Sequence, residues 1–340
     1  MAHAPLPRAP ADALGPTGPR LGAYAGPLGR ADFSSLAPEG LLASLGFAAR
    51  LRRWQEVFLV TPTHLLALSL HEAGPLASAG VWAVERARGE VRFDRTAAGV
   101  AGLSARVGPR PGAGARATFV GPGLSLTLER RSDRFQLEAD LGDDLRLSAR
   151  LDTRGAPEPF ALVAPLPEGG VRAAQHTGPL TVEGRLSLRG QPVALEGALA
   201  ALAFGAGVFA RAPAWRRLTA IGPVRPGAPG VLHLLEGLAA GPDDDCGEDA
   251  LLAAGGPWRL PAVAFEAPEP DRPWRIGSRG GEVALEFAPA ASHREAAPLR
   301  LGGETTRLAG ELTGSVPGPD GAPLEVVRWP AVIEALVARG

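Results

Sequence analysis

Apolar and polar residues alternate with a period of two along most of this chain, the pattern of β-strands that have one buried and one solvated face. The clearest example lies on both sides of Gly142-Asp143-Asp144, where every second residue is apolar: Phe135, Leu137, Ala139 and Leu141 before the turn, and Leu145, Leu147, Ala149 and Leu151 after it. The same pattern predicts hairpins around Thr61-Pro62-Thr63 and over residues 181–197. Many short strands between Gly- and Pro-rich turns predict an all-β, mainly antiparallel protein.

Two segments depart from this period and predict a short helix near each end of the chain. Between Glu39 and Leu51 apolar residues fall at helical spacing, and the arginines that follow suit a helix C-terminus. Pro330 is a good first residue for a second helix, in which four apolar side chains would share one face: Val332, Ile333, Leu336 and Val337.

Chain length and turn density favour two β units over one. The 340 residues exceed what one small core needs, and 45 glycines and 34 prolines break long elements. The stretch from Gly155 to Gly170 is densest in turn residues and predicts a division near Glu168. We therefore expect a flexible arm over residues 1–18, an N-terminal β domain over 19–168 and a C-terminal β domain over 169–340, each a barrel or sandwich.

Charge and cysteine content narrow the partners and the compartment. The formal net charge is −1 with both signs dispersed, so nucleic acid is not an expected partner. Cys246 is the single cysteine and cannot form an internal disulfide, which favours a cytoplasmic protein. The N-terminus lacks the apolar core of a signal peptide, and no stretch approaches the ~20 apolar residues of a membrane helix. We expect a soluble protein without a membrane span, and the oligomeric state stays open.

An acidic run near residue 245 carries the first candidate site. Glu248 and Asp249 end this run, whose spacing does not match a calcium-binding loop. The run is either a solvated loop or the source of catalytic carboxylates, which would act as a general acid if burial raised their pKa. Cys246 lies among the same carboxylates, which disfavour its thiolate and a nucleophilic role.

Histidines supply the second set of candidates. The six histidines are scattered and show no HExxH spacing, so no metal is expected. His233 lies in the apolar run VLHLLEG and is either a core residue or a pocket residue, and His176 precedes a predicted strand. The chain has neither a lysine nor a glycine-rich phosphate loop that opens a helix, so P-loop nucleotide binding is excluded and no cofactor is implied.

Four segments together carry a resemblance to a known family. In order they are Arg52-Arg53-Trp54 before a hairpin, TVEGRLSLRG, Gly205-Ala206-Gly207-Val208-Phe209 with Trp215 behind it, and PWRIGSRGGEVALEFAP. From about Gly18 to its C-terminus the chain resembles a divergent member of the bacterial domain-of-unknown-function 2804 (DUF2804) family. That family is similar in strand content to two-barrel, lipocalin-like proteins, which include carotenoid hydratases and tocopherol cyclases. The resemblance implies two lipocalin-like halves and makes an apolar ligand cavity plausible.

The departures from the family pattern bear on catalysis. Where the resemblance implies Asp-Trp-Gly-Arg-Gly, this chain reads Ala203-Phe204-Gly205-Ala206-Gly207. The acidic and the basic residue are thus both replaced by alanine, and Phe204 occupies the tryptophan position. Polar residues expected after a C-terminal Trp are likewise replaced by apolar ones, in Trp329-Pro330-Ala331-Val332. Glu248, the region of His176, and Trp215 remain.

These observations favour three functions. The first is binding of an apolar small molecule, a lipid or isoprenoid, with weak or lost catalysis; its ligand-binding residues would be His176, Phe204, Trp215 and His233. The second is a hydratase, cyclase or isomerase that protonates an alkene through Glu248 or Asp249, which requires a buried carboxylate. The third is a protein-interaction module, which would show an exposed apolar patch in place of a cavity.

Overall fold

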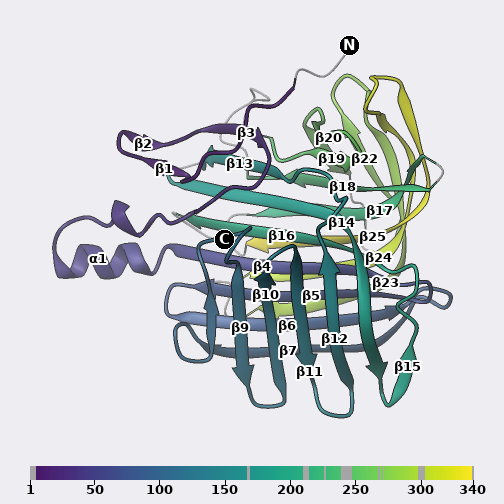
Figure 1. Cartoon of the computed structure of the whole chain (residues 1–340), viewed down its shortest axis with the longest axis horizontal. Helices are drawn as coiled ribbons and strands as arrows, with labels where there is room; N and C mark the ends of the chain where they lie inside the picture. Colours follow the sequence, from purple (N-terminus) through teal and green to yellow (C-terminus); the bar gives the residue numbers. More distant parts are fainter. Residues whose placement is uncertain are drawn as a thin grey trace.

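Nearly every described element is an antiparallel β-strand (Figure 1). The computed structural model describes residues 5–166, 169–209, 214–225, 227–238, 247–266, 269, 271–297 and 303–338. Two helical segments lie within these ranges, the 3-10 turn η1 (Ser34–Leu36) and helix α1 (Leu41–Ala48), and a two-stranded ribbon pairs β1 (Leu14–Gly15) with β2 (Gly18–Pro19). No helix among the described residues is long and apolar enough to cross a membrane.

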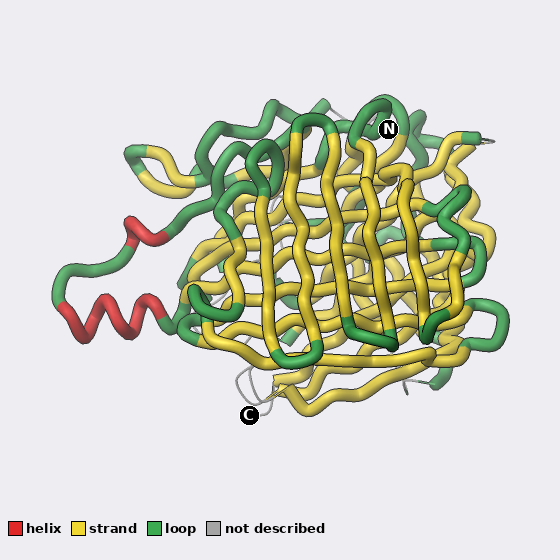
Figure 2. Tube along the Cα trace, turned by 60° about the horizontal axis from the view of Figure 1, so that its bottom comes forward, coloured by secondary structure: helices red, strands yellow, loops and turns green. Residues whose placement is uncertain are grey.

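The first sheet forms a nearly closed barrel. Among the described residues, its strands follow the order β7-β6-β5-β4-β16-β14-β12-β11-β10-β9-β8; off this path, β13 and β15 pair with β14, and β3 pairs with β13. Their bounds are β3 (Gly22–Ala25), β4 (Leu51–Val60), β5 (His64–Ala73), β6 (Leu76–Glu85), β7 (Glu90–Val100), β8 (Ala105–Val107), β9 (Arg116–Gly121), β10 (Leu124–Arg131), β11 (Arg134–Asp140), β12 (Leu145–Asp152), β13 (Phe160–Pro165), β14 (Val171–Leu188), β15 (Gln191–Val193) and β16 (Leu199–Val208). Strands β9–β12 cross over the strands behind them (Figure 2).

The second sheet forms a half-barrel in the order β20-β19-β18-β17-β25-β24-β23-β22-β21 within the described part of the chain. Its strands are β17 (Trp215–Arg225), β18 (Ala228–Glu236), β19 (Ala250–Ala253), β20 (Gly256–Arg259), β21 (Val263–Glu266), β22 (Trp274–Ser278), β23 (Ala284–Ala297), β24 (Gly303–Pro317) and β25 (Pro323–Ala338). Contacts of β14 with β18 and β19, and of β7 with β23, place the two sheets against each other.

Strand alternation divides most of the buried apolar side chains between three larger cores, and a small fourth cluster contains Leu166, Phe209 and Leu238. On β4, Val57 and Leu59 point into the first barrel, whereas Phe58 and Val60 pack between the two sheets. The half-barrel has its own core around Trp329. Strands at the sheet-to-sheet interface therefore bury both faces, and the alternation of apolar and polar residues is lost there.

The hairpins predicted from the sequence are confirmed. β4 and β5 pair around the Thr61-Pro62-Thr63 turn, with Val60 opposite Leu65. β11 and β12 pair over the alternating segments, with Leu137 opposite Ala149. Strand β14 also pairs with the short β15. The prediction of a mainly antiparallel two-barrel fold was correct.

The predicted C-terminal helix is wrong, because its residues form the second half of strand β25. Ile333 points into the half-barrel core and Val332 packs between the sheets, so both faces of this segment are buried. Apolar residues on both faces of a strand resemble helical spacing over a few residues, which explains the error. The β-branched Val and Ile suit the strand.

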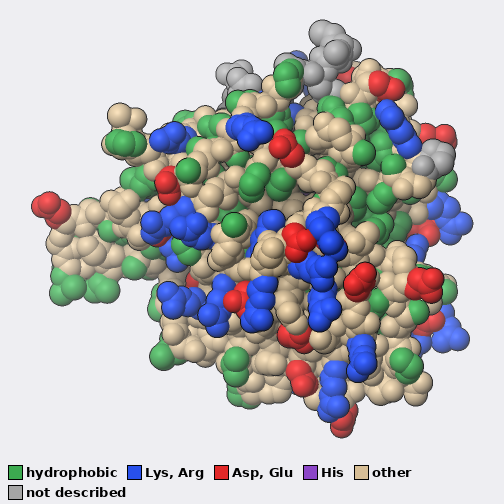
Figure 3. All heavy atoms as spheres, viewed as in Figure 1, with side chains coloured by type: hydrophobic (Ala, Val, Ile, Leu, Met, Phe, Trp, Pro, Cys, Tyr) green, Lys and Arg blue, Asp and Glu red, His purple; other side chains and the backbone are tan. Residues whose placement is uncertain are grey.

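The N-terminal helix is confirmed as α1, but its apolar residues face solvent. Leu41 and Leu42 are 77% and 84% exposed, and only Phe47 of this helix is buried. The helix projects from the barrel, and hydrophobic side chains gather at its far end (Figures 1 and 3).

The change from one sheet to the other comes later than Glu168. That residue lies outside the described ranges, and the strands on either side of it pair with each other, with Pro165 opposite Val171. The first sheet continues to Val208, and the second begins at Trp215. Part of the expected N-terminal arm is packed, because Ala13 is fully buried and its N–H donates to the carbonyl of Arg30 at 2.8 Å.

Packing around Trp329 gives a first prediction. A Cβ at Gly222 would lie 2.3 Å from carbons of the buried Trp329 ring, so Gly222→Ala should lower the free energy of unfolding by about 1–3 kcal/mol or more. Gly46 lies in α1, where an added Cβ would meet no described atom within 4 Å, and Gly46→Ala should be neutral or stabilising by up to about 1 kcal/mol. Urea denaturation of both variants checks the pair, and equal effects would contradict this packing.

Candidate functional site

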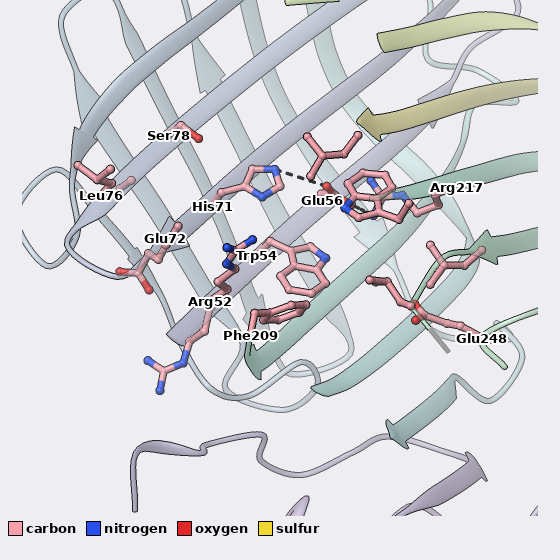
Figure 4. Close-up of a pocket in the computed structure, with 17 residues that line it drawn as sticks. Arg52, Trp54, Glu56, His71, Glu72, Leu76, Ser78, Phe209, Arg217 and Glu248 are labelled. Atoms are coloured by element: carbon pink, nitrogen blue, oxygen red, sulfur yellow. Dashed lines mark ion pairs between the residues drawn. The ribbon is translucent and has the colours of Figure 1, made fainter. Parts of the chain in front are cut away.

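An apolar cavity opens between strands of the two sheets, and we call it the outer cavity (Figure 4). It encloses about 870 Å³ of empty space, part of which is open to solvent. Its apolar lining comes from β4, β6, β17, β18 and β25 and from the segments that follow β16 and β18; it includes Trp54, Leu76, Phe209, Trp215, Leu235, Leu238 and Leu336. Arg52, Arg53, Glu72 and Ser78 add polar groups.

A glycine makes room for the aromatic wall of the outer cavity. Gly205 on β16 lies opposite Trp54 on β4, and a Cβ there would be 2.0 Å from the indole ring. The absence of that atom lets the indole lie flat on the sheet, 6.0 Å from the ring of Phe209 at an interplanar angle of 57°. The glycine of the Gly205-Ala206-Gly207 segment thus has a packing role.

Four buried side chains form a polar cluster beside this cavity, which we call the Glu248 cluster: Arg172, His176, His233 and Glu248. Arg172 and His176 are four residues apart on β14, so they share one face of the strand. His233 comes from β18, and Glu248 precedes β19. The cluster therefore joins the two sheets.

The carboxylate of Glu248 is the centre of the cluster. Its Oε2 accepts a hydrogen bond from Nη1 of Arg172, and its Oε1 lies 2.6 Å from Nε2 of His176. Nε2 of His233 is 3.5 Å from the same Oε1 and has no hydrogen-bond partner within the described part of the chain. The two imidazole rings are stacked, with centroids 3.5 Å apart.

Electrostatics keep both imidazoles neutral. Burial lowers the pKa of His176 well below 6.5, and the positive charges of Arg217 and Arg172 lower it further. The pKa of His233 is lowered by burial first and then by His176 and the same two arginines. A neutral His176 donates its Nε2 proton to the Glu248 carboxylate, whose negative charge Arg172 compensates.

Asp249 has a structural environment that differs from that of Glu248. Its Oδ1 accepts the N–H of Leu235 at 2.9 Å, and its backbone carbonyl accepts the N–H of Leu260 at 2.9 Å. Asp249 is buried but is not among the described residues that line the outer cavity. It ties β18 to the segments around it.

A second cluster of buried charges lies between the sheets around Arg217. This guanidinium on β17 contacts the carboxylates of Glu56 on β4 and Glu334 on β25. Although burial opposes its charge, these two carboxylates raise the pKa of Arg217 above its ordinary value. Glu334 also accepts a hydrogen bond from Nε of Arg307 at 2.9 Å.

An inner cavity lies on the far side of Arg217, deeper between the sheets. It contains about 610 Å³ of empty space, part of which is open to solvent, and it is lined by residues of both sheets, including Phe58, Ala67, Ala201, Ala203, Val231 and Val332. Glu56 and Arg217 line both cavities, while His176 and His233 face the inner one and Glu248 the outer one. The two cavities are thus neighbours across a wall of charged side chains.

The structure brings together most of the residues that the sequence nominated. Glu248, His176 and His233 meet in one cluster, and Trp215 lines the outer cavity with Glu248. Phe204 lies elsewhere: it belongs to the core of the first barrel and is not among the described residues that line either cavity. Residues 241–246 of the acidic run, Cys246 included, lie outside the described ranges.

Sequence reasoning missed the arginines of the site. Arg172 pairs with Glu248, which is 76 residues away in the sequence, and Arg217 pairs with Glu334, which is 117 residues away. One signal was present in the sequence: Glu56 and Glu334 are single charges within the apolar runs QEVFLV and VIEALV. A charge that cannot reach solvent requires a partner, so such positions predict buried ion pairs.

The cluster also contains metal-ligating residue types. One ligand atom from each of His176, His233 and Glu248 lies within 4.8 Å of the others, a grouping that the local spacing of histidines could not reveal. However, Oε2 of Glu248 already accepts a hydrogen bond from Arg172. A cation bound by this carboxylate would lie close to the Arg172 guanidinium, so the donor set fits a divalent metal poorly.

Comparisons with known proteins agree with this architecture. The family model described as "Domain of unknown function (DUF2804)" matches residues 9–339. No curated protein matches the sequence. Among solved structures, an AttH-type protein from Nitrosomonas europaea is 16% identical with a TM-score of 0.56 and covers 84% of this chain and 92% of that chain.

Two further structures are similar at the level of the fold. CghA, solved with Sch210972, is 14% identical with a TM-score of 0.55 and covers 86% of this chain and 90% of that one. Kievitone hydratase from Nectria haematococca is 11% identical with a TM-score of 0.54 and covers 84% of this chain and 89% of that one. At these identities the likeness establishes a shared fold.

The histidine pair predicts a loss of stability in mild acid. The unfolded chain protonates both histidines near pH 6.5, whereas the folded protein keeps them neutral, so the unfolded state binds more protons below that pH. The free energy of unfolding should fall as the pH drops below 6.5, by up to about 1.4 kcal/mol per pH unit for each histidine. Urea denaturation between about pH 7 and pH 5.5 measures this slope.

Two variants separate this effect from general acid sensitivity. The His176→Gln/His233→Gln protein should show a flatter profile over the same pH range. His64 is only partly buried and its pKa is lowered less, so His64→Gln should flatten the profile less. An unchanged slope in the double variant would mean that the folded protein carries protonated imidazoles.

The ion pair at the centre of the Glu248 cluster gives a third prediction. Arg172→Met leaves the Glu248 carboxylate buried without its cation and should lower the free energy of unfolding by about 3–5 kcal/mol. Adding Glu248→Gln removes that charge and should restore a large part of the loss. Arg131→Met, which removes an exposed pair with Glu129, should have no measurable effect. Thermal or urea unfolding measures these differences in stability. If the Arg172→Met/Glu248→Gln protein is no more stable than Arg172→Met, the pairing of Arg172 with Glu248 is contradicted.

Proposed function

The chain belongs to the DUF2804 family, and from the lining of the outer cavity we propose that it binds an apolar small molecule, a lipid or an isoprenoid. The observation that carries this proposal is an aromatic and aliphatic cavity with the Glu248 carboxylate and the Arg217 guanidinium at its inner side. Ligand sites are commonly of this kind, with an apolar lining and a few convergent polar groups that fix the ligand's orientation.

The fold and the site chemistry support binding in different ways. Of the proteins with a similar fold, one was solved with Sch210972 and another is a kievitone hydratase, so this architecture accommodates small molecules in other chains. Ala203 and Ala206 occupy the positions where the family resemblance implies an aspartate and an arginine. Binding with weak or lost catalysis is therefore the leading function.

Ligand binding at the outer cavity can be tested with β-ionone, a cyclic isoprenoid ketone. Trp54 and Trp215 line the cavity, so bound β-ionone should quench tryptophan fluorescence in a saturable manner. Ser78→Trp places a large side chain in the half-buried lining and should weaken binding by at least about tenfold. Thr127→Trp on the outer face of β10 is the control and should bind as the wild type does.

Mass spectrometry of the native protein and lipid extraction address the natural ligand. We expect an apolar compound to copurify with the wild-type protein and to be depleted in the Ser78→Trp variant. Equal binding of β-ionone by the wild-type and Ser78→Trp proteins, together with purified protein that carries no such compound, would contradict the proposal.

A second function, proton transfer to or from a bound alkene or ketone, is favoured by one observation. The buried Glu248 carboxylate accepts a hydrogen bond from His176 at 2.6 Å and faces the outer cavity. Arg172 favours the ionised carboxylate, so Glu248 suits a proton acceptor better than the general acid expected from the sequence. In D2O, the wild type should exchange the acidic protons of β-ionone faster than Glu248→Gln does, and equal rates would exclude this role.

A further inference from the structure

Two neighbouring cavities lie between the sheets, and charged side chains line the boundary between them. Glu56 and Arg217 line both, so their ion pair forms part of the wall between the cavities. The contact between His176, which faces the inner cavity, and Glu248, which faces the outer one, forms another part. Without this wall the outer cavity would extend into the inner one.

The Arg217 side chain is held firmly in this position. Its guanidinium contacts Glu56 from the first sheet and Glu334 from the second, and its Cζ lies 5.2 Å from the centre of the Trp215 ring. The side chain of Arg217 is only 13% exposed. To move it would separate buried charges, which is costly in a medium of low dielectric constant.

The inner cavity has an apolar part beside a charged one, in which Arg307 and Glu334 are paired with each other. Phe58, Ala201, Val231 and Val332 belong both to its lining and to the apolar core between the sheets. Ala67 and Ala203 are small, half-buried residues that leave space there. An apolar chain that passed Arg217 would therefore meet a favourable environment.

We propose that Arg217 determines the length of the ligand, by closing the outer cavity against an apolar inner cavity that would otherwise extend it. The inference rests on ligand binding in the outer cavity, as proposed above. The ligand is then a compact apolar molecule, and a polar atom at its inner end meets the Arg217 guanidinium or the Glu248 carboxylate. Longer apolar molecules are excluded because their distal end would have to displace a buried ion pair.

A length series of isoprenoid alcohols tests the proposal: geraniol, farnesol and geranylgeraniol, measured by calorimetry or by mass spectrometry of the native complex. In the wild type, affinity should stop increasing with length once the outer cavity is filled. The variant E56Q/R217A removes both charges of the ion pair, while Glu334 keeps its hydrogen bond to Arg307. This variant should bind the longest alcohol on the order of tenfold or more tightly than the wild type does.

Two controls test whether the increase in affinity for the longest alcohol comes from the inner cavity. Arg216 precedes Arg217 on β17 but pairs with Glu236 near the surface, so R216A should keep the wild-type length profile. Adding Ala203→Leu to E56Q/R217A refills the inner cavity and should cancel the gain for the longest alcohol while leaving geraniol binding unchanged. Should E56Q/R217A not fold, E56Q/R217Q replaces it, because the glutamine amide can still donate a hydrogen bond to Glu334.

The outcomes separate the two proposals. If both the wild type and the E56Q/R217A variant bind geraniol, and their affinities change with alcohol length in the same way, the role of Arg217 is overturned. The outer cavity then remains a ligand site. A gain that persists after Ala203→Leu would also overturn the role of Arg217. No binding of any alcohol by any of these proteins would overturn the proposed function and this inference with it.

Discussion

The packing of two sheets against each other is the constraint on which the rest of this structure depends. A strand with one solvated face can place any polar residue there, but β4, β14, β16, β17 and β25 have no solvated face where the sheets meet. A polar side chain in that layer must find a partner within it. The Glu248 cluster and the Arg217–Glu56 pair join residues of the first sheet to residues of the second, and Arg217 also pairs with Glu334 of its own sheet. The cavities lie in the same layer.

This arrangement gives the site unusual electrical properties for an apolar cavity. Arg172 compensates the charge of Glu248, Arg217 is paired with Glu56 and Glu334, and the stacked imidazoles beside them are neutral, so buried ion pairs lie directly next to apolar side chains. Moving any one of these charged side chains would leave its partner uncompensated in a medium of low dielectric constant.

The sequence predicted the strands with solvated faces well and the buried layer poorly. Hairpins such as Phe135–Leu151 were evident because water on one face enforces a period of two. In Val332-Ile333-Glu334 both faces are buried, so the period disappears and a helix was predicted where β25 lies. The candidates Glu248, His176 and His233 were identified because polar residues stand out in apolar surroundings, yet their meeting depends on pairing between distant strands. Phe204 packs in the core of the first barrel, and the sequence could not show this because strand register decides which face of β16 each residue occupies.

Gly205 has a consequence for how such a cavity can change over evolution. It supports the indole of Trp54 from behind, on the side away from the cavity, and it does not line the cavity itself. A single added methyl group would push the indole off the sheet and change the shape of the outer cavity. That shape can therefore change through a residue that does not line the cavity, while every side chain of the lining stays the same.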